Sequence, residues 1–354
     1  MNKVYITKTT SASVINDYQK LLRKASYLKT FDLSQPVIIK LNLSWTRFYP
    51  AVSTWPWQLE AVIKTLIEDG INPEKIIPVE NKTVVTDVMK GSINNKWLPI
   101  LHKYGVKMHY LTDEQYIDYK PKSPLLVMGK VFNKVSLPKI IIGKNIIHLP
   151  TMKMHVFTTT TGAIKNYFGM LKTTRHYAHR NIHETLVDLL SIQKEIHPGI
   201  FAVMDGTTVG KGSGPRAMEW ETKNYLLASS DLVAIDAVAA KMMGFHPLDL
   251  DYLKLAQEKK LGVADPKKIK IIGEDVKQIN WNYKKRDTFA SKGQKFIYHK
   301  SPLWVEKALL QSPLVPWSYF ASNFYHDFYW WNLFGIKRVN KFLKTDWGRL
   351  FLNY

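Results

Sequence analysis

Short apolar runs alternate with amphipathic stretches along the first three quarters of the chain. Apolar runs bounded by proline, glycine or polar clusters are typical of strands buried on both faces of a sheet. Stretches with apolar residues three and four positions apart are typical of helices. Strands are expected at 4–6, 37–42, 75–80, 106–111, 140–149, 200–204, 224–228 and 269–272, with further short strands within 125–139. Helices are expected at 13–29, 56–70, 97–104, 184–196, 231–243 and 249–258.

This alternation predicts an α/β fold with a largely parallel sheet and flanking helices, an arrangement that allows two lobes with a site between them. The pattern changes near residue 280, where the chain becomes basic and rich in aromatic residues and the alternation of strands and helices stops. We therefore expect an α/β domain over residues 1–279 and a basic, aromatic, helical C-terminal extension over residues 280–354.

Charge and composition restrict the classes of function. The formal net charge of +21 favours binding of anionic partners, namely nucleic acid, anionic lipid, or small phosphorylated or carboxylated molecules. A solvated basic surface without a specific partner would give the same excess of positive charge. The absence of cysteine excludes thiolate catalysis and cysteine-bound iron–sulfur clusters. The first residues lack the apolar run of a signal peptide, and no apolar stretch is long enough to span a bilayer. A cytoplasmic location is expected.

The richest candidate chemistry follows the strand expected to end at Leu149. There the chain is expected to open into a polar turn that leads into a helix, which is where open α/β folds bind ligands. His155 could move a proton or bind a metal, and a desolvated Lys165 could act as a base or a nucleophile. Thr158–Thr161 could offer donors to an anion at the start of the helix. Structural alternatives are a plain helix cap and a lysine that covers apolar surface.

Two aspartates and a glycine-rich stretch lie further along the chain. Asp205 ends an expected strand and opens a loop with Gly210, Gly212 and Gly214, whose N–H groups could approach an anion. A flexible surface turn is the alternative. Asp236 falls on an apolar helix face, so burial would require a partner, either Lys165, a histidine or a backbone donor.

Two further clusters complete the candidates. Lys40 is unusual in an apolar strand, and Asn42 and Glu80 follow at strand ends where polar pockets occur. His176, His179 and His183 would share one helix face, which suits a metal. The neighbouring arginines would repel a cation and favour a basic face instead.

Together these segments resemble the family known as domain of unknown function 362. The resemblance runs from about residue 37 to residue 273, through Ile38-Ile39-Lys40-Leu41-Asn42, Ser53-Thr54-Trp55-Pro56, Leu149–His155, Thr161–Gly169, Met204-Asp205-Gly206, Gly212–Pro215 and Ser230–Asp236. Many relatives carry cysteine-rich modules that bind iron–sulfur clusters, which this chain cannot hold. His155 and Lys165 are also spaced similarly to the histidine and lysine of the nickel-dependent lactate racemase family, although Thr161–Ile164 stands where that family is glycine-rich.

The favoured hypothesis is an enzyme acting on a small anionic substrate. Its predicted catalytic residues are His155, Lys165 and Asp205. Its predicted substrate-binding residues are Lys40, Asn42, Lys153, Thr161, Gly162, Asn166, Gly212, Gly214 and Asp236. The sequence does not identify a cofactor, and a divalent metal ion is one candidate. The alternative is a binding protein that reaches an anionic membrane surface or nucleic acid through the basic aromatic tail, peripheral to the membrane. A helical cap packed on the main domain would also explain that tail.

Overall fold

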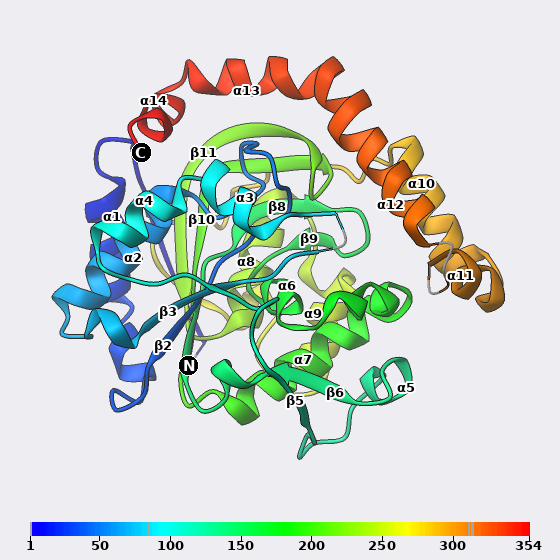
Figure 1. Ribbon diagram of the computed structural model, residues 1–354. Coiled ribbons are helices and arrows are strands. Elements are labelled where there is room, and N and C mark those ends of the chain that lie inside the picture. The colour runs from blue at the N-terminus through cyan, green and yellow to red at the C-terminus, as the bar shows by residue number, and fades with distance from the viewer. Residues whose placement is uncertain (1, 84, 311, 313–314) are drawn as a thin grey trace.

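The apolar runs of the first 273 residues assemble into one large sheet with helices on both faces (Figure 1). The computed structural model describes residues 2–83, 85–310, 312 and 315–354. The sheet runs in the order β12-β1-β11-β10-β7-β2-β3-β4, and β8 and β9 extend it beside β10. Its strands are β1 (Lys3–Lys8), β2 (Val37–Lys40), β3 (Ile76–Glu80), β4 (His109–Tyr110), β7 (Asn145–His148), β8 (Thr151–His155), β9 (Thr159–Thr161), β10 (Ile200–Ser213), β11 (Ala217–Ser229) and β12 (Lys270–Gly273).

Most strand pairs are parallel, which confirms the predicted α/β class. Within the described large sheet, six strand pairs are parallel: β10–β7, β7–β2, β2–β3, β3–β4, β10–β8 and β1–β12. The antiparallel pairs of this sheet are those of β11 with β1 and with β10 and that of β8 with β9. A separate small hairpin joins β5 (Tyr116–Tyr119) to β6 (Val135–Pro138).

Alternate residues of the central strands enter two cores on opposite faces of the sheet. Val37 and Ile39 of β2 pack under α1 and α2, while Ile38 packs under α6, α7 and α8. This follows from the two-residue period of a strand, which sends successive side chains to opposite faces. The covering helices are α1 (Val14–Lys24), α2 (Pro56–Glu68), α3 (Val88–Asn94), α4 (Trp97–Lys103), α5 (Met128–Val131), α6 (Ala163–Asn166), α7 (Ile182–Ile196), α8 (Leu232–Met243) and α9 (Asp251–Glu258).

The motif region differs from its predicted form. The residues expected to make a polar turn after Leu149 form β8, which pairs with β10 and then turns back as β9. The threonine run is therefore strand, and the helix it was expected to cap begins later, at Ala163. The prediction failed because a run of short polar residues gives no apolar period, whereas β10 supplies a long partner for the ladder.

The predicted glycine-rich loop is also strand. Residues 205–213 continue β10 far beyond the expected end at Met204 and pair with β11, with Gly210 opposite Trp220 and Gly212 opposite Met218. The three histidines expected on one helical face lie in or just after the 3₁₀ segment Thr173–Asn181. Glycine and histidine positions there were decided by pairing and packing with distant segments, not by local propensity.

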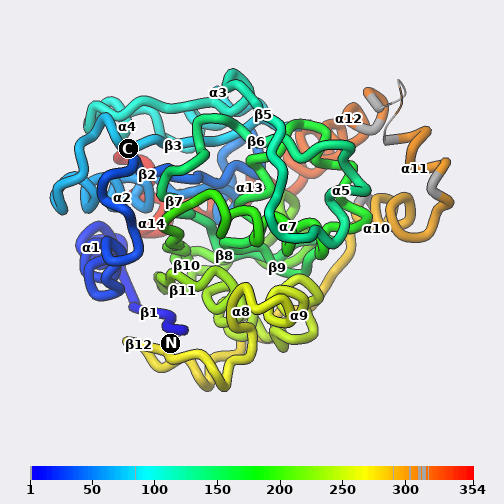
Figure 2. The backbone as a smooth tube through the Cα atoms, turned by 90° about the horizontal axis from the view of Figure 1, so that it is seen from below, coloured from blue at the N-terminus to red at the C-terminus, as the bar shows by residue number. Residues whose placement is uncertain are grey.

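Residues beyond Asn280 form helices that arch over one side of the body (Figure 1). They are α10 (Phe289–Lys295), α11 (Leu303–Leu310), α12 (Val315–Asn323), α13 (Ile336–Leu343) and α14 (Asp346–Leu352), with π-helical turns at Phe296–Lys300 and Phe324–Gly335. Seen from below, α10 to α12 lie at one edge of the body, and α11 projects farthest from it (Figure 2). Among the described helices, none has the length and apolar character needed to cross a membrane.

The end of the extension packs as a cap on the core. Phe342, Trp347 and Phe351 are buried beside α1 and α2. The Phe351 ring stacks on Phe48 with centroids 3.8 Å apart, and Trp347 lies 5.1 Å from Trp57. The tail is therefore an integral part of the fold at this end.

Candidate functional site

A cavity of about 530 Å³ lies between the α/β body and the C-terminal extension. Its floor comes from the carboxyl ends of β2, β3 and β8 and from α6, and its outer wall comes from α10, α12 and the π-helical turns. Five of the predicted site residues line it, namely Lys40, Asn42, His155, Lys165 and Asn166. Residues far apart in the sequence thus meet at one edge of the sheet, as the topology of parallel strands favours.

Lys165 is the unpaired cation of this cavity. Its side chain is largely enclosed, and within the described residues its Nζ has no hydrogen-bond or ion-pair partner. The nearest aromatic ring is that of Phe168, 5.6 Å from Nζ. Desolvation, with a smaller contribution from the charge of Arg175, lowers the pKa of Lys165 to about 8. An appreciable fraction of Lys165 is therefore the neutral amine near physiological pH, whereas an ordinary lysine is almost entirely protonated there.

His155 is held in one tautomer by the turn that follows β8. Its Nδ1 accepts hydrogen bonds from the backbone N–H groups of Phe157 (3.2 Å) and Thr158 (3.3 Å). Burial, reinforced by the charge of Lys165, holds the pKa of His155 well below its usual value. A neutral imidazole that accepts at Nδ1 carries its proton on Nε2. His155 is therefore a neutral hydrogen-bond donor at the cavity wall.

Two arginines complete the positive floor, and neither was among the predicted site residues. Arg175 is buried and donates to the carbonyl oxygens of Leu171 (2.8 Å) and Lys82 (2.6 Å). Arg216 is also buried, and its Nη2 donates to Ser322 of α12 (3.0 Å). Its Nη1 is a buried donor without a partner in the described structure. Burial lowers the pKa of Arg216 to about 10, so the group stays charged at neutral pH.

Lys40 is the cation of the floor that has a counter-ion. Its Nζ lies 2.8 Å from Glu80 and also donates to the Leu41 carbonyl (2.5 Å). Asn166 donates to the Lys40 carbonyl (3.0 Å), and its own Oδ1 is buried without a donor. Against four cationic side chains the lining contains one carboxylate, that of Glu80. The cavity therefore has an excess of positive charge and is suited to an anion.

Two further histidines face the cavity with their Nε2 atoms as acceptors. His179 and His326 each point Nδ1 at a backbone carbonyl, 2.8 Å from that of His176 and that of Ser322. Each Nδ1 is therefore the protonated nitrogen. Burial lowers the pKa of both imidazoles to about 3, so both are neutral. The cavity thus offers neutral hydrogen-bond acceptors as well as cations.

The other predicted anion-binding residues lie behind the lining. Lys153 is buried against Asn42 (2.5 Å), Thr151 and the Val52 carbonyl, so its donors are occupied. Thr161 ends β9 opposite Lys153 of β8, and its hydroxyl lies 3.4 Å from the Lys153 carbonyl. Gly214 passes so close to the Met154 carbonyl that a side chain there would collide with it. Gly212 lies near the turn that carries Pro215 and Arg216 into the cavity.

The two predicted aspartates are not among the residues that line the cavity. Asp205 shares the face of β10 with Phe201 and Val203, so it points towards α1 and α2. There it accepts hydrogen bonds from Tyr18 (2.6 Å) and Trp57 (2.9 Å). Asp236 accepts from the N–H groups of Ala163 (2.7 Å) and Ile164 (3.1 Å) and so caps α6. A side chain at position 162 would collide with the Asp236 carboxylate, so the close approach of that carboxylate to the backbone requires glycine there.

No group of three or more histidine, aspartate or glutamate side chains in the described parts of the chain is placed to hold a metal ion. The predicted trio separates, because His176 and His179 line the cavity while His183 does not.

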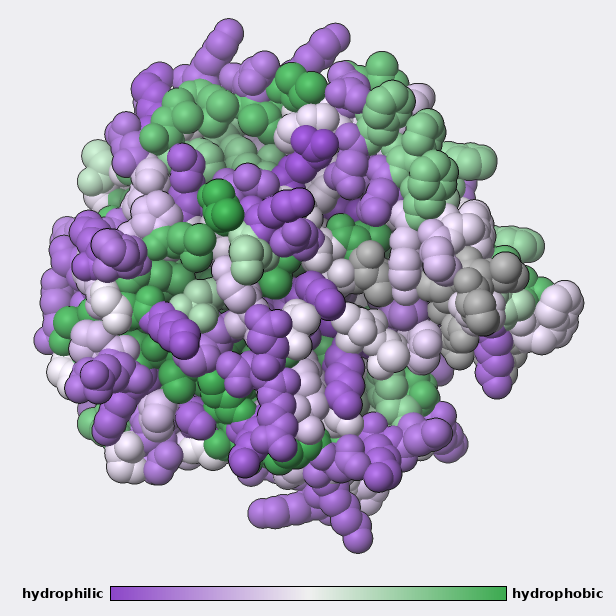
Figure 3. Space-filling view, viewed as in Figure 1, coloured by the Kyte–Doolittle hydropathy of each residue, from purple (hydrophilic) through white to green (hydrophobic). Residues whose placement is uncertain are grey.

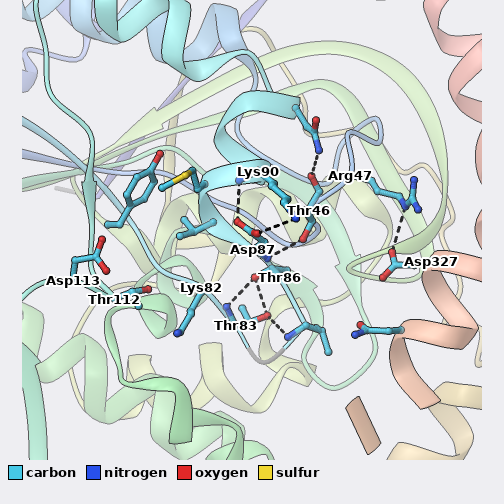
Figure 4. Close-up of a pocket in the computed structure, with 16 residues that line it drawn as sticks. Thr46, Arg47, Lys82, Thr83, Thr86, Asp87, Lys90, Thr112, Asp113 and Asp327 are labelled. Atoms are coloured by element: carbon cyan, nitrogen blue, oxygen red, sulfur yellow. Dashed lines mark hydrogen bonds and ion pairs between the residues drawn. The ribbon is translucent and has the colours of Figure 1, made fainter. Parts of the chain in front are cut away.

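A second hollow, of about 680 Å³, lies next to the cavity and shares Thr83 and Val85 with it (Figure 4). Its polar groups largely satisfy one another. Arg47 lies 3.6 Å from Asp327, and Asp87 accepts from the N–H of Lys90 and donates its own N–H to Thr46. We assign the chemistry to the cavity of Lys165 because it contains Lys165 without a counter-ion and the buried Nη1 of Arg216 without a partner in the described structure.

The fold and the cavity define an α/β protein with a buried, positively charged site at the carboxyl edge of its sheet. The chain belongs to the family described as Domain of unknown function (DUF362), which it matches over residues 37–241. It is similar to a thylakoid-associated protein of Synechocystis sp., with 25% identity over 176 residues that cover 48% of this chain. The chain spans about half (51%) of that relative's length. A protein of Thermotoga maritima of known structure overlaps 71% of this chain and 60% of its own, with 11% identity and a TM-score of 0.38.

Proposed function

We propose that the protein is an enzyme that binds a small anionic substrate in this cavity and transfers a proton to or from it through Lys165. One observation carries the proposal: Lys165 and Arg216 line the same cavity, where Lys165 has no carboxylate as a partner and the Nη1 of Arg216 is buried without a hydrogen bond among the described residues. Leaving a buried charged donor unpaired costs free energy, which a bound carboxylate or phosphate would offset.

The neighbouring groups fit defined roles in such a reaction. Arg216 and the Nε2–H of His155 would bind the anionic group. Arg175 would hold the pKa of Lys165 down, as its charge does in the ligand-free cavity. A lysine with a pKa near 8 can serve as base or acid close to physiological pH. Asp205 and Asp236 would support the sheet and α6 rather than touch the substrate.

Native mass spectrometry of protein purified from its own host tests this proposal. We expect an anionic molecule to be retained by the wild type and lost from Lys165→Met and Arg216→Gln. The exposed Lys120→Met is a matched control that should retain it. Once a substrate is known, Lys165→Ala should abolish turnover with little change in melting temperature. His155→Ala should abolish turnover and also lower the melting temperature, because it leaves the N–H groups of Phe157 and Thr158 without an acceptor. Retention of the same molecule by all variants would refute the proposed site.

A second function, association with an anionic membrane surface, is proposed on a separate observation. Phe320, Phe324 and Phe328 of the extension are 72%, 52% and 61% exposed. Exposed rings followed along the chain by the basic residues of α13 suit the headgroup region of a bilayer, and the similarity to a thylakoid-associated protein supports this. Flotation with phosphatidylglycerol-containing vesicles should fail for a variant with serine at all three positions. Equal flotation of that variant would exclude this surface as the anchor.

A further inference from the structure

The cavity has a charged inner end and an aromatic outer end. Among its lining residues, Arg175, His155 and Arg216 are buried, whereas Phe289 is 90% exposed and Trp317 is 48% exposed. The exposed residues belong to α10 and α12, so the mouth of the cavity lies between these two helices of the extension.

The wall between the two ends is apolar. Phe157, Phe168, Ile297 and Tyr298 line it, and the rings of Phe157 and Tyr298 pack edge to face 5.5 Å apart. A small polar anion would occupy only the inner end and leave this wall in contact with water. A ligand that matches the whole cavity therefore combines an anionic group with an apolar chain.

The outer surface of the same helices is also apolar. Phe320, Phe324 and Phe328 stack in a row, with centroids 6.2 Å and 5.3 Å apart. Trp317 precedes Phe320 and Phe324 by three and seven residues, so the row continues along the helix to the mouth of the cavity. Hydrophobic residues gather at this upper right side of the molecule (Figure 3). We call Trp317, Phe320, Phe324 and Phe328 the phenylalanine row.

The charges around the phenylalanine row favour an anionic partner. Residues 307–345 contain five basic residues and one acidic residue, Asp327. The carboxylate of Asp327 is turned inwards, where it accepts from Trp45 Nε1 (2.5 Å) and lies 3.6 Å from Arg47. Lys337, Lys341 and Lys344 are exposed. An apolar row that leads along the chain into an exposed basic helix matches a bilayer surface that carries anionic lipid.

We infer that the substrate is an amphiphile with one anionic head group and one apolar chain, taken from an anionic membrane on which the phenylalanine row rests. This inference rests on the proposed function of the cavity. The head group binds Arg216 and His155 beside Lys165, and the chain lies along Phe157, Ile297 and Trp317 towards the mouth. The extension thus contacts the bilayer through its outer face and the bound substrate through its inner face.

Calorimetric titration with three probes tests the substrate class: methyl phosphate, decyl phosphate and decyl glucoside. Each pair of buried methylene groups strengthens binding roughly tenfold, so decyl phosphate should bind at least tenfold more tightly than methyl phosphate. Arg216→Gln should weaken both phosphates at least tenfold. Ile297→Ser should weaken decyl phosphate alone, and Phe296→Ser, one residue away and outside the cavity, should change neither.

The outcomes separate the two proposals. Equal affinity for the two phosphates would overturn the amphiphile and leave the anion site standing. Binding of decyl glucoside as tight as that of decyl phosphate would overturn both, because the head group would not be recognised, and so would the failure of both phosphates to bind.

A vesicle experiment tests the membrane route. Uptake of decyl phosphate is followed from phosphatidylcholine–phosphatidylglycerol vesicles that contain it, with the variant that carries serine at residues 320, 324 and 328. The variant should bind free decyl phosphate as the wild type does but take it up from vesicles at least tenfold more slowly. Equal uptake from vesicles would overturn delivery through the phenylalanine row.

Discussion

Lys165 shows at the scale of one residue how a site differs from a surface. Most lysines of this chain are exposed, and the cation of Lys40 has Glu80 as its counter-ion. Lys165 is largely enclosed and has no carboxylate as a partner within the described chain, and Arg175 adds a second positive charge. Because desolvation and the Arg175 charge disfavour the protonated amine, the pKa of Lys165 is lowered. A larger fraction of neutral amine is then present near neutral pH, and the neutral amine is the reactive form.

Acylation of Lys165 should therefore titrate at an unusual pH. Only the neutral amine reacts with acetic anhydride, so the rate at Lys165 should be half-maximal near pH 8, against about 10.4 for an ordinary lysine. Peptide mass spectrometry after brief labelling measures this, with Lys120 as the internal reference. Identical pH profiles for the two residues would contradict the lowered pKa.

At the scale of elements, two buried aspartates join segments that carry or support the site. Asp236 of α8 caps α6, the short helix that presents Lys165 and Asn166. Asp205 ties β10 to α1 and α2 through Tyr18 and Trp57. Each carboxylate thus connects two parts of the fold through hydrogen bonds, and a substitution at each tests a different consequence.

Asp236 should make stability depend on pH. Burial raises its pKa to about 7, so between pH 4 and 7 the folded protein binds more protons at this group than the unfolded chain does. Its contribution is therefore present at pH 4 and is lost as the pH rises towards 7, by up to about 1.4 kcal/mol per pH unit. Urea unfolding of the wild type and Asp236→Asn across this range should show that loss in the wild type only.

Replacement of Asp205 by asparagine should destabilise the fold and leave ligand binding intact. An amide cannot accept from Tyr18, Trp57 and Thr207 together, because one of its two polar atoms is itself a donor. We expect a loss of about 1–3 kcal/mol in the free energy of unfolding. Denaturant titration measures it, and a loss of anion affinity in a protein of wild-type stability would instead support the catalytic role predicted from the sequence.

At the scale of the whole molecule, the extension is attached to the body along its length and exposes the phenylalanine row on its outer side. Phe342, Trp347 and Phe351 close the aromatic cluster over α2, and Glu306 of α11 pairs with Arg180 (2.5 Å) on the body. Deleting the extension would strip this cluster and remove a wall of the cavity. Point substitutions in the exposed part are therefore the better probe of membrane association.

Trp347→Ala tests the fixed end. The indole is buried against Trp57, and its Nε1 donates to Asn224 (2.8 Å), so truncation leaves a large cavity and an unpaired amide. We expect a loss of about 3–5 kcal/mol in the free energy of unfolding. Arg349→Ala on the exposed side of α14 should cost less than about 1 kcal/mol. Similar stability of the two variants would show that α14 does not contribute to the core.

The sequence by itself determined the layered α/β class, the helical extension and the convergence of Lys40, His155 and Lys165, because apolar periodicity sets the elements and parallel strands bring their carboxyl ends to one edge. Only the tertiary structure decided which polar residues enter the cavity. Asp205 lies on the opposite face of the sheet because one step along a strand reverses the side chain, and the predicted end of β10 was several residues short. Arg216 and His326 meet at the site because a distant helix folds over it, a contact that leaves no local pattern in the sequence.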